Sequence, residues 1–165
     1  MQCLTPVLLI FLITVLPSCN EGDRWMMATK IEKSITRTSF PADTFNIRDF
    51  GAVADDTSFL NTKAIEAAIL KCQSAGGGVV LVPAGKWTTG PVTLLSNVNL
   101  HISENATLAF STDYELYLPP VLTRWEGMDC YNIHPLIYAN GASNIALPGK
   151  GTIDGQASDE VWWWM

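Results

Sequence analysis

One short segment combines residue types that could bind a carboxylate and a flat ring: Thr123-Arg124-Trp125-Glu126-Gly127. A guanidinium such as that of Arg124 can hold a carboxylate through two parallel hydrogen bonds, and an indole such as that of Trp125 can stack on an apolar ring face. The segment falls in a long excursion between predicted strands, where binding loops are commonly placed. We therefore predict that Arg124, Trp125 and Glu126 contact a substrate. An alternative stays open, in which Arg124 and Glu126 form a surface pair above a Trp125 that packs the excursion down.

Other polar clusters are predicted to be structural. Asp55-Asp56 is an acidic pair, and Asn61-Thr62-Lys63 follows it. Both lie around the start of a predicted helix, where Asp, Asn and Thr serve as caps and N-terminal charges. His101 is predicted to point outward from a strand, and His134 to lie in a loop. The sequence has no Cys and His spacing typical of a metal site and no Ser/His/Asp set, so it predicts neither a metal nor a cofactor.

The N-terminus has the pattern of an export signal. The first 19 residues contain no Asp, Glu, Lys or Arg and include an apolar run, Val7 to Leu16. This run is too short to span a bilayer, which needs about 20 helical residues. It predicts a signal peptide over residues 1–19. Leu16-Pro17-Ser18-Cys19 is similar to the lipobox of bacterial lipoproteins, so Cys19 is predicted to be lipidated; the alternative is an ordinary cleavage site near Ser18. In either case we expect the mature chain to be exported.

Composition limits the possible partners. Residues 20–39 have mixed charges and no sustained hydrophobic period, which predicts a flexible tether before a domain over residues 40–165. The formal net charge is −6 and Lys and Arg form no cluster, which argues against nucleic acid as a partner.

The four cysteines do not predict a disulfide framework. Cys3 would leave with the signal peptide, and Cys19 would carry the lipid. Cys72 and Cys130 are predicted to be isolated core thiols, with a single disulfide between them as the open alternative.

One helix precedes all the predicted strands of the domain. Its apolar stripe falls at positions i, i+3, i+4 and i+7: Ile65, Ala68, Ile69 and Cys72. This spacing predicts a helix of about three turns, with Asn61 or Thr62 capping its start and Gly76–Gly78 providing a left-handed exit.

After the helix, the hydrophobic period changes to two. The predicted strands are 79–82, 91–95, 98–102, 106–110, 135–139, 144–147 and 151–154. In the third of these, Val98, Leu100 and Ile102 share one face while Asn99 and His101 take the other. These segments are predicted to be half-buried strands.

A five-residue match predicts how the strands are arranged. Ser96-Asn97-Val98-Asn99-Leu100 returns as Ser143-Asn144-Ile145-Ala146-Leu147, 47 residues later. Two coils of a solenoid, each of about 20 to 25 residues, would fit this interval and place both Asn97 and Asn144 at equivalent bends. The predicted fold class is an all-β parallel β-helix whose open end is capped by the α-helix. A β-sandwich is the alternative, but signals for two-residue hairpin turns are scarce, with Asn140-Gly141 the lone candidate.

These motifs resemble glycoside hydrolase family 28, the polygalacturonase family. The resemblance runs from about Phe45 to the last residue: FNIRDFGAVADDT with NTKAIEAAI, GGGVVLVPAGKWTTGPVTLLSNVNLHI, and PLIYANGASNIALPGKGTIDGQ followed by a Trp pair. The first two pieces are shared with many pectin-degrading and phage β-helices, whereas GKGTIDGQ followed by WW is more specific. Residues 123–139 also resemble bacterial members. The resemblance implies a right-handed, pectate-lyase-like parallel β-helix.

The resemblance also implies an activity: hydrolysis of α-galacturonosyl linkages of pectin with inversion. Inversion requires a carboxylic acid and a carboxylate roughly 6.5 to 9.5 Å apart, with water between them. The family's aspartates lie in an NTD segment and a DD pair, supported by a GHG histidine and an RIK segment, and none of the four motifs occurs here. No residue is therefore assigned as catalytic, and Asp154 resembles a structural position of a coil. We expect residues 1–165 to be an inactive N-terminal part whose catalytic aspartates lie beyond residue 165.

The implied partner is a pectic polysaccharide, either polygalacturonate or rhamnogalacturonan. Arg124 would bind a uronate carboxylate and Trp125 would stack on a sugar ring, while one of Trp162–Trp164 would pack on the coils. We expect a full-length monomer that meets the membrane only through its lipid anchor, as an outer-membrane or cell-surface lipoprotein or a periplasmic or secreted protein. The alternative is a non-catalytic, carbohydrate-binding β-helix or a pseudogene product. A lyase would need clustered carboxylates for Ca²⁺ and an arginine base, and the sequence shows no such cluster.

Overall fold

The computed structural model describes residues 21–161, which fall into two compact units, one ending at Arg37 and one beginning at Thr38. The predicted signal peptide 1–19, its lipidation site Cys19 and the segment Trp162–Trp164 lie outside the described residues. The predictions made for them stay predictions.

The described part of the first unit contains one helix, α1 (Glu21–Ser34). Its side chains are exposed from Trp25 onward. The sequence pattern predicts a tether over 20–39 and no helix, because the apolar residues of this segment do not repeat with a helical period. The tether role remains a prediction. None of the helices within residues 21–161 is long and apolar enough to cross a membrane.

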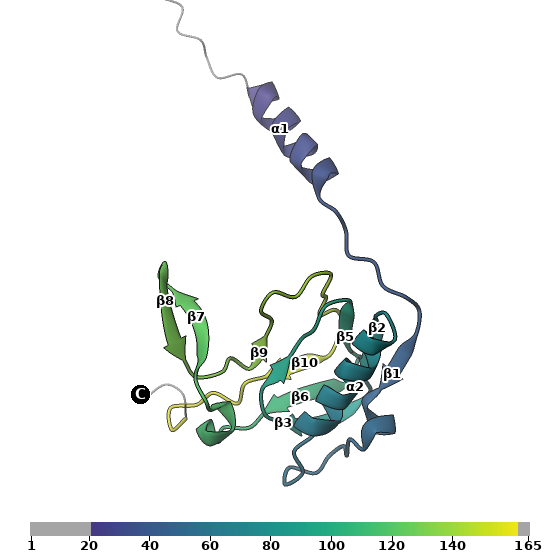
Figure 1. Cartoon of the computed structure of the whole chain (residues 1–165), viewed down its shortest axis with the longest axis vertical. Coiled ribbons are helices and arrows are strands. Elements are labelled where there is room, and N and C mark those ends of the chain that lie inside the picture. Colours follow the sequence, from purple (N-terminus) through teal and green to yellow (C-terminus); the bar gives the residue numbers. More distant parts are fainter. Residues whose placement is uncertain (1–20, 162–165) are drawn as a thin grey trace, which may run out of the picture. The chain divides into compact units, whose positions relative to one another are not determined.

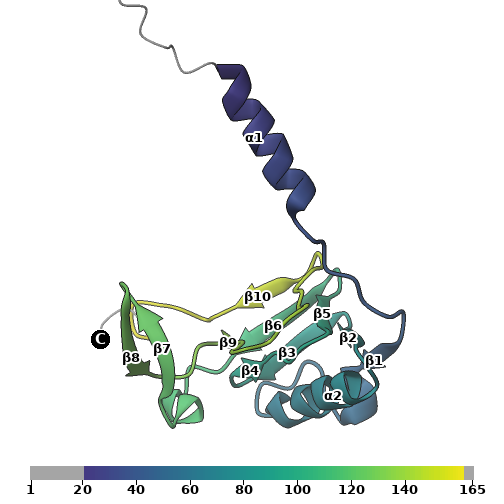
Figure 2. The same cartoon turned by 45° about the horizontal axis from the view of Figure 1, so that its top comes forward.

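The second unit winds as stacked coils whose strands form three parallel sheets (Figures 1 and 2). The first sheet contains β1 (Thr44–Asn46), β2 (Gly78–Val82) and β5 (Val98–Ile102). The second contains β3 (Gly85–Thr89), β6 (Ala106–Phe110) and β10 (Thr152–Asp154). The third contains β4 (Val92–Thr93) and β9 (Ile137–Tyr138). The chain visits the three sheets in turn and all of these pairs are parallel, so the prediction of a parallel β-helix is confirmed.

Register and burial explain why the coils stack. Gly78 pairs with Val98 and Gly85 with Ala106, so one coil advances the chain by 20 or 21 residues. Val80 pairs with Leu100, and both side chains are fully buried. Strands β2 and β5 bury every second residue, as their alternating sequence predicts. The inward side chains of successive coils therefore form one continuous core.

Strand β3 does not show this alternation and is not predicted by the sequence pattern. Trp87, Thr88 and Thr89 are all buried in succession. The Trp87 indole donates to the Pro83 carbonyl (2.7 Å), and the Arg48 guanidinium lies 5.2 Å from the ring centroid. The one polar atom of the Trp87 side chain thus has a partner, and a cation lies over the ring, which makes the burial of this large side chain favourable.

Helix α2 (Thr62–Ser74) packs on this core beside the short 3-10 helix η1 (Ile47–Phe50). The predicted stripe is confirmed, because its four members are buried in the core cluster: Ile65, Ala68, Ile69 and Cys72. Gly76, Gly77 and Gly78 all have positive φ after the helix, as predicted for its exit.

The predicted side-chain cap of α2 is wrong. Asn61 occupies the N-cap position without a capping side-chain bond. Its fully buried amide instead accepts from Val53 N (2.7 Å) and donates to Val53 O and Thr88 O (3.0 Å each). Thr62 is also engaged elsewhere, since its Oγ1 accepts from Gly90 N at 2.7 Å. Both side chains therefore fasten the start of α2 to the strand layer.

The 47-residue interval corresponds to one coil and not to the two predicted. Asn99 bridges to Ala146 in parallel, so residues 47 apart are direct neighbours in the stack. The equivalence of the two bends is correct: Asn97 and Asn144 both have positive φ, and their side chains are hydrogen bonded. Segment 144–147 contributes this isolated bridge and no regular strand. The coil is long because residues 111–136 form an excursion between β6 and β9.

The excursion begins with the 3-10 helix η2 (Tyr114–Tyr117) and continues as an antiparallel hairpin of β7 (Val121–Trp125) and β8 (Met128–Asn132). The hairpin projects from the coils in both views (Figures 1 and 2). No hairpin is predicted here by the sequence, and Asn140-Gly141, its one hairpin candidate, is a bend without paired strands.

The two described cysteines are not bonded to each other. Cys72 is a core thiol as predicted, and burial, with a smaller effect of the Asp43 charge, raises its pKa. The prediction of a core position for Cys130 is wrong, because this residue is only half-buried on β8 of the projecting hairpin.

Candidate functional site

The predicted substrate segment forms the tip of the hairpin. Glu126 and Gly127 make its two-residue turn, with φ of 48° and 86°. Two positive φ values match the twist of the flanking strands, which is why such turns close hairpins. Arg124 Nη2 donates to the Gly127 carbonyl (3.0 Å) and closes the turn from the side. The tip is therefore a two-residue turn with a side-chain hydrogen bond across it.

Arg124 and Trp125 point to opposite faces of this hairpin, since neighbouring residues of a strand alternate. Arg124 pairs across the strands with Asp129 at 3.5 Å, and both side chains are about 70% exposed (70% and 71%). An ion pair this exposed contributes little to stability. Neither side chain forms the arrangement of the alternative prediction, because Arg124 pairs with Asp129 in place of Glu126 and Trp125 remains 62% exposed.

The Trp125 face of the hairpin borders a cavity of about 440 Å³, which we call the hairpin cavity. Its lining comes from three places: the hairpin (Thr123, Trp125, Asn132), the segment 133–136, and Gly155 with Ala157 after β10. Arg124 is not part of this lining. A flat indole at the edge of an open cavity can stack on a ring that enters it.

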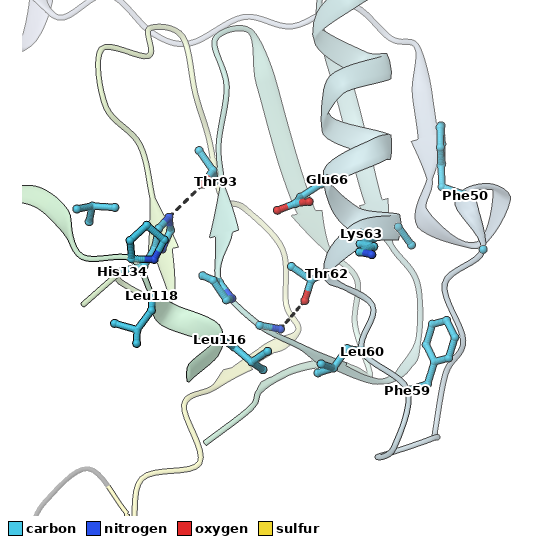
Figure 3. Close-up of a pocket in the computed structure, with 16 residues that line it drawn as sticks. Phe50, Phe59, Leu60, Thr62, Lys63, Glu66, Thr93, Leu116, Leu118 and His134 are labelled. Atoms are coloured by element: carbon cyan, nitrogen blue, oxygen red, sulfur yellow. Dashed lines mark hydrogen bonds between the residues drawn. The ribbon is translucent and has the colours of Figure 1, made fainter. Parts of the chain in front are cut away.

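A second cavity of about 810 Å³, the helix cavity, lies between α2 and the start of the excursion (Figure 3). Apolar side chains dominate its lining: Phe50, Phe59, Leu60, Leu116, Leu118 and Val121. Lys63 and Glu66 face it from α2, and Figure 3 shows His134 on the opposite side. Glu66 is the single carboxylate among the described residues that line these two cavities.

His134 lines both cavities and is held in one orientation. Its Nδ1 lies 2.7 Å from the Pro135 carbonyl, which can only accept, so Nδ1 carries the proton of the neutral ring. Nε2 lies 3.3 Å from the Thr93 hydroxyl, and the ring meets the Tyr138 ring edge-on at 5.0 Å. The prediction that His134 lies in a loop is confirmed. The contact of its ring with Thr93 could not be predicted, because the two residues are 41 positions apart and no sequence signal connects them.

The acidic pair has structural partners that differ from those predicted. Asp55 does not serve the helix: its carboxylate accepts from Lys86 N (2.9 Å) at the edge of β3. Asp56 accepts from the Ser58 hydroxyl (2.6 Å) and amide (2.9 Å) in a local turn. The Ser58 hydroxyl, followed by its amide, holds the pKa of Asp56 below the ordinary value. Neither aspartate lines the hairpin or helix cavity.

His101 and Asp154, the remaining candidates, lie on or just after strands of the coils. His101 lies between the buried residues Leu100 and Ile102 of β5 and points outward, as predicted. Asp154 accepts from Gln156 N (2.8 Å) as β10 ends, which is a turn interaction. No group of three or more His, Cys, Asp or Glu side chains within residues 21–161 could hold a metal ion.

Comparison with known proteins gives one consistent relationship. No family model matches the chain. A probable polygalacturonase of Vitis vinifera is 31% identical over 171 residues, which cover 98% of this chain and 34% of the relative. A 62-residue stretch is 44% identical to mannuronan C5-epimerase AlgE3 of Azotobacter vinelandii, covering 33% of this chain and 3% of the epimerase.

A solved structure, the hyperthermoactive exopolygalacturonase of Thermotoga maritima, superposes with a TM-score of 0.79 at 38% identity and covers 84% of this chain and 31% of that one. The chain thus spans about a third of the length of these two polygalacturonases. The relative that covers 98% of the chain and the solved structure that covers 84% of it are both polygalacturonases, and the chain belongs to the polygalacturonase-like family.

Proposed function

We propose that the protein hydrolyses α-galacturonosyl linkages of pectin with inversion of the anomeric carbon. The similarity to the Thermotoga maritima exopolygalacturonase, 38% identity at a TM-score of 0.79, carries this proposal. Inversion needs a proton-donating carboxylic acid and a second carboxylate that activates water on the opposite face of the sugar ring. The described cavities hold Glu66 alone, so we infer that the catalytic aspartates lie outside residues 1–165.

A reducing-sugar assay on polygalacturonate tests this function. Residues 1–165 and the whole protein are compared at equal concentration, and the products are separated by length. We expect activity in the whole protein and none in residues 1–165. Release of single sugars would indicate attack at chain ends, and a ladder of oligomers internal attack. Activity in residues 1–165 alone would show that the carboxylates lie within this chain.

The epimerase match favours one other function for testing. Mannuronan is also a polymer of a carboxylate-bearing sugar, and the matched stretch of 62 residues is 44% identical. The whole protein is therefore incubated with mannuronan, and its C5 configuration is followed by NMR. Inversion at C5 without cleavage of either polymer would replace hydrolysis by epimerisation. Binding without either reaction would indicate the non-catalytic carbohydrate-binding alternative.

We infer further that the hairpin cavity receives a sugar of the polymer and that Trp125 stacks on it. The exposure of Trp125 and its place at the cavity edge support this role. Arg124 points away from the cavity toward Asp129, so its part is to hold the tip of the hairpin. Glu126 lies in the exposed turn, where its charge would repel a uronate, and we expect contacts with sugar hydroxyls only.

Two structural roles complete the proposal. Helix α2 is inferred to close one end of the coils, since its buried stripe belongs to their core. Cys19 is inferred to carry a lipid that anchors the exported protein to a membrane. Radioactive palmitate labelling of wild type and Cys19→Ala tests the anchor: label in both proteins, or in neither, would contradict it.

A further inference from the structure

The hairpin cavity has fixed and largely apolar walls. Its apolar side chains are Trp125, Ile133, Pro135, Leu136 and Ala157. The wall at Leu136 is bonded to the coils, because the Leu136 carbonyl accepts from Val92 N (2.9 Å). Gly155 leaves this wall uncovered, since a Cβ at that position would lie 3.2 Å from Leu136 Cδ1. With a volume of about 440 Å³, the cavity has the size of a site for a small ligand.

The lining that the described part of the chain provides for this cavity contains no Lys, Arg, Asp or Glu. Arg124 lies on the opposite face of the hairpin and pairs with Asp129 at 3.5 Å. Both ring nitrogens of His134 have protein partners, the Pro135 carbonyl at 2.7 Å and the Thr93 hydroxyl at 3.3 Å. A carboxylate that enters the cavity would thus lose water without meeting an opposite charge, which costs free energy.

Acidic residues directly follow two segments of this lining. Glu126 comes after Trp125 in the hairpin turn, and Asp159 and Glu160 lie in the turn that follows Ala157. All three acidic side chains are exposed. Negative charges near a binding site repel an anion and have little effect on an uncharged ligand. The charge around the cavity therefore favours an uncharged sugar.

The cavity also offers neutral hydrogen-bond donors. Asn132 Oδ1 accepts from Ile133 N (2.8 Å), which leaves the Asn132 Nδ2 group to donate. The Thr123 hydroxyl lines the same cavity. Such donors can bond to an ester carbonyl or to sugar hydroxyls, and the apolar walls can cover a methyl group. The size, charge and donors of the cavity thus fit a pyranose ring that carries a methyl ester.

We propose that the hairpin cavity binds a methyl-esterified galacturonosyl residue of pectin in preference to a free galacturonate. The sugar ring stacks on Trp125, the ester methyl contacts the apolar walls, and the ester carbonyl accepts from Asn132 or Thr123. This selection deepens the proposed function, on which it rests for the identity of the polymer. It assigns partly esterified pectin to the site as the substrate class.

Two ligands that differ only in the ester test this preference: methyl α-galactosiduronic acid and its methyl ester. The whole protein is isotope-labelled on tryptophan, and NMR follows the Trp125 indole N–H, which is assigned by its loss in Trp125→Phe. Neither ligand contains a linkage between two galacturonosyl residues, so both affinities can be measured even if the protein hydrolyses no pectin. At neutral pH we expect the ester to bind about tenfold more tightly than the acid. No response of the Trp125 signal, equal affinities or tighter binding of the acid would overturn the proposal.

Two matched lysine variants provide the control. Thr123→Lys and Leu122→Lys add the same charge at adjacent positions, but Thr123 lines the cavity, whereas Leu122 is 52% exposed on the opposite face of the hairpin. Thr123→Lys should reverse the preference, so that the acid binds more tightly than the ester, and Leu122→Lys should keep it. Asn132→Lys adds a cation from an exposed position of the same cavity and should act as Thr123→Lys does, even if the latter folds poorly. The same ligand preference in the cavity variants and in Leu122→Lys would contradict the proposal.

Discussion

Asn144 Nδ2 donates to Asn97 Oδ1 over 3.0 Å, although 47 residues separate the two. Both asparagines have left-handed backbones, with φ of 52° and 64°, at the same bend of consecutive coils. Gly77 occupies this bend in the coil before, close to the Asn97 backbone. The three residues form a column that keeps the coils in register at one corner. A short polar side chain suits this corner, since Asn tolerates the left-handed region better than most residues.

Replacement of Gly77 should destabilise the coils far more than replacement of its neighbour. A Cβ on Gly77 would lie 2.6 Å from the Asn97 carbonyl oxygen, with φ at +110°, whereas a Cβ on Gly76 (φ +99°) meets nothing within 4 Å. Gly76→Ala should cost about 1 to 2 kcal/mol of backbone strain. Gly77→Ala should cost about 3 kcal/mol or more, because the stack must also move. Urea unfolding measures the free energy of unfolding of both variants, and equal losses in the two would show that the column is not tightly packed.

Asn144 should contribute through its side chain as well as its backbone. Its amide also donates to Ser39 O (2.9 Å) and accepts from Ser39 N (3.2 Å), which fastens the start of the second unit to the last coil described. Asn144→Gly keeps the left-handed bend but loses these hydrogen bonds, which should lower the free energy of unfolding by about 1 kcal/mol. Asn144→Ala loses the same bonds and also places Ala in the left-handed backbone region, so the free energy of unfolding should fall by about 2 kcal/mol in total. Asn140→Ala, at an exposed position, is the control, and losses equal to that control would contradict the role of the column.

The coils could be predicted because their inward residues alternate. Val98, Leu100 and Ile102 are buried while Asn99 and His101 turn outward, as the sequence indicates. Strand β3 is hidden from such a pattern because Thr88 and Thr89 are buried polar residues. The Thr89 hydroxyl lies 3.2 Å from that of Thr62, and a partner 27 residues away cannot be recognised from local sequence.

The hairpin could not be predicted for a different reason. Both of its faces are largely exposed, so no hydrophobic alternation marks β7 or β8. Its turn, Glu126-Gly127, lacks the Asn or Asp that signals such a turn. The same excursion lengthens one coil to 47 residues, which explains why the repeat interval wrongly predicts two coils. The position of the candidate site was thus predictable, but the opposite directions of Arg124 and Trp125 require the strand pairing.

Trp125 and Arg124 should contribute unequally to substrate binding. In the whole protein, Trp125→Ala removes the indole at the edge of the hairpin cavity and should lower the affinity for an oligogalacturonate by about 1 kcal/mol, or about fivefold in Kd. Arg124→Ala should change the affinity little, because Arg124 pairs with Asp129 outside this cavity. Titration calorimetry measures both. A larger loss for Arg124→Ala would place the sugar on the other face of the hairpin.

Tyr117 should make the stability of the excursion depend on alkaline pH. The side chain is buried, and its hydroxyl donates to the Ser111 carbonyl (2.7 Å). Burial, with a smaller effect of the Asp113 charge, raises the pKa of Tyr117 from 10.0 to about 12. The folded state thus favours the neutral phenol, whose contribution to stability is complete below pH 10 and is lost as the pH rises toward 12.

Tyr117→Phe removes this titration together with one hydrogen bond, so it should cost about 1 kcal/mol at neutral pH and flatten the alkaline decline of the free energy of unfolding. Urea unfolding between pH 8 and pH 12 measures the slope, with Tyr131→Phe on the exposed hairpin as the control. An unchanged slope in Tyr117→Phe would mean that another group causes the alkaline loss.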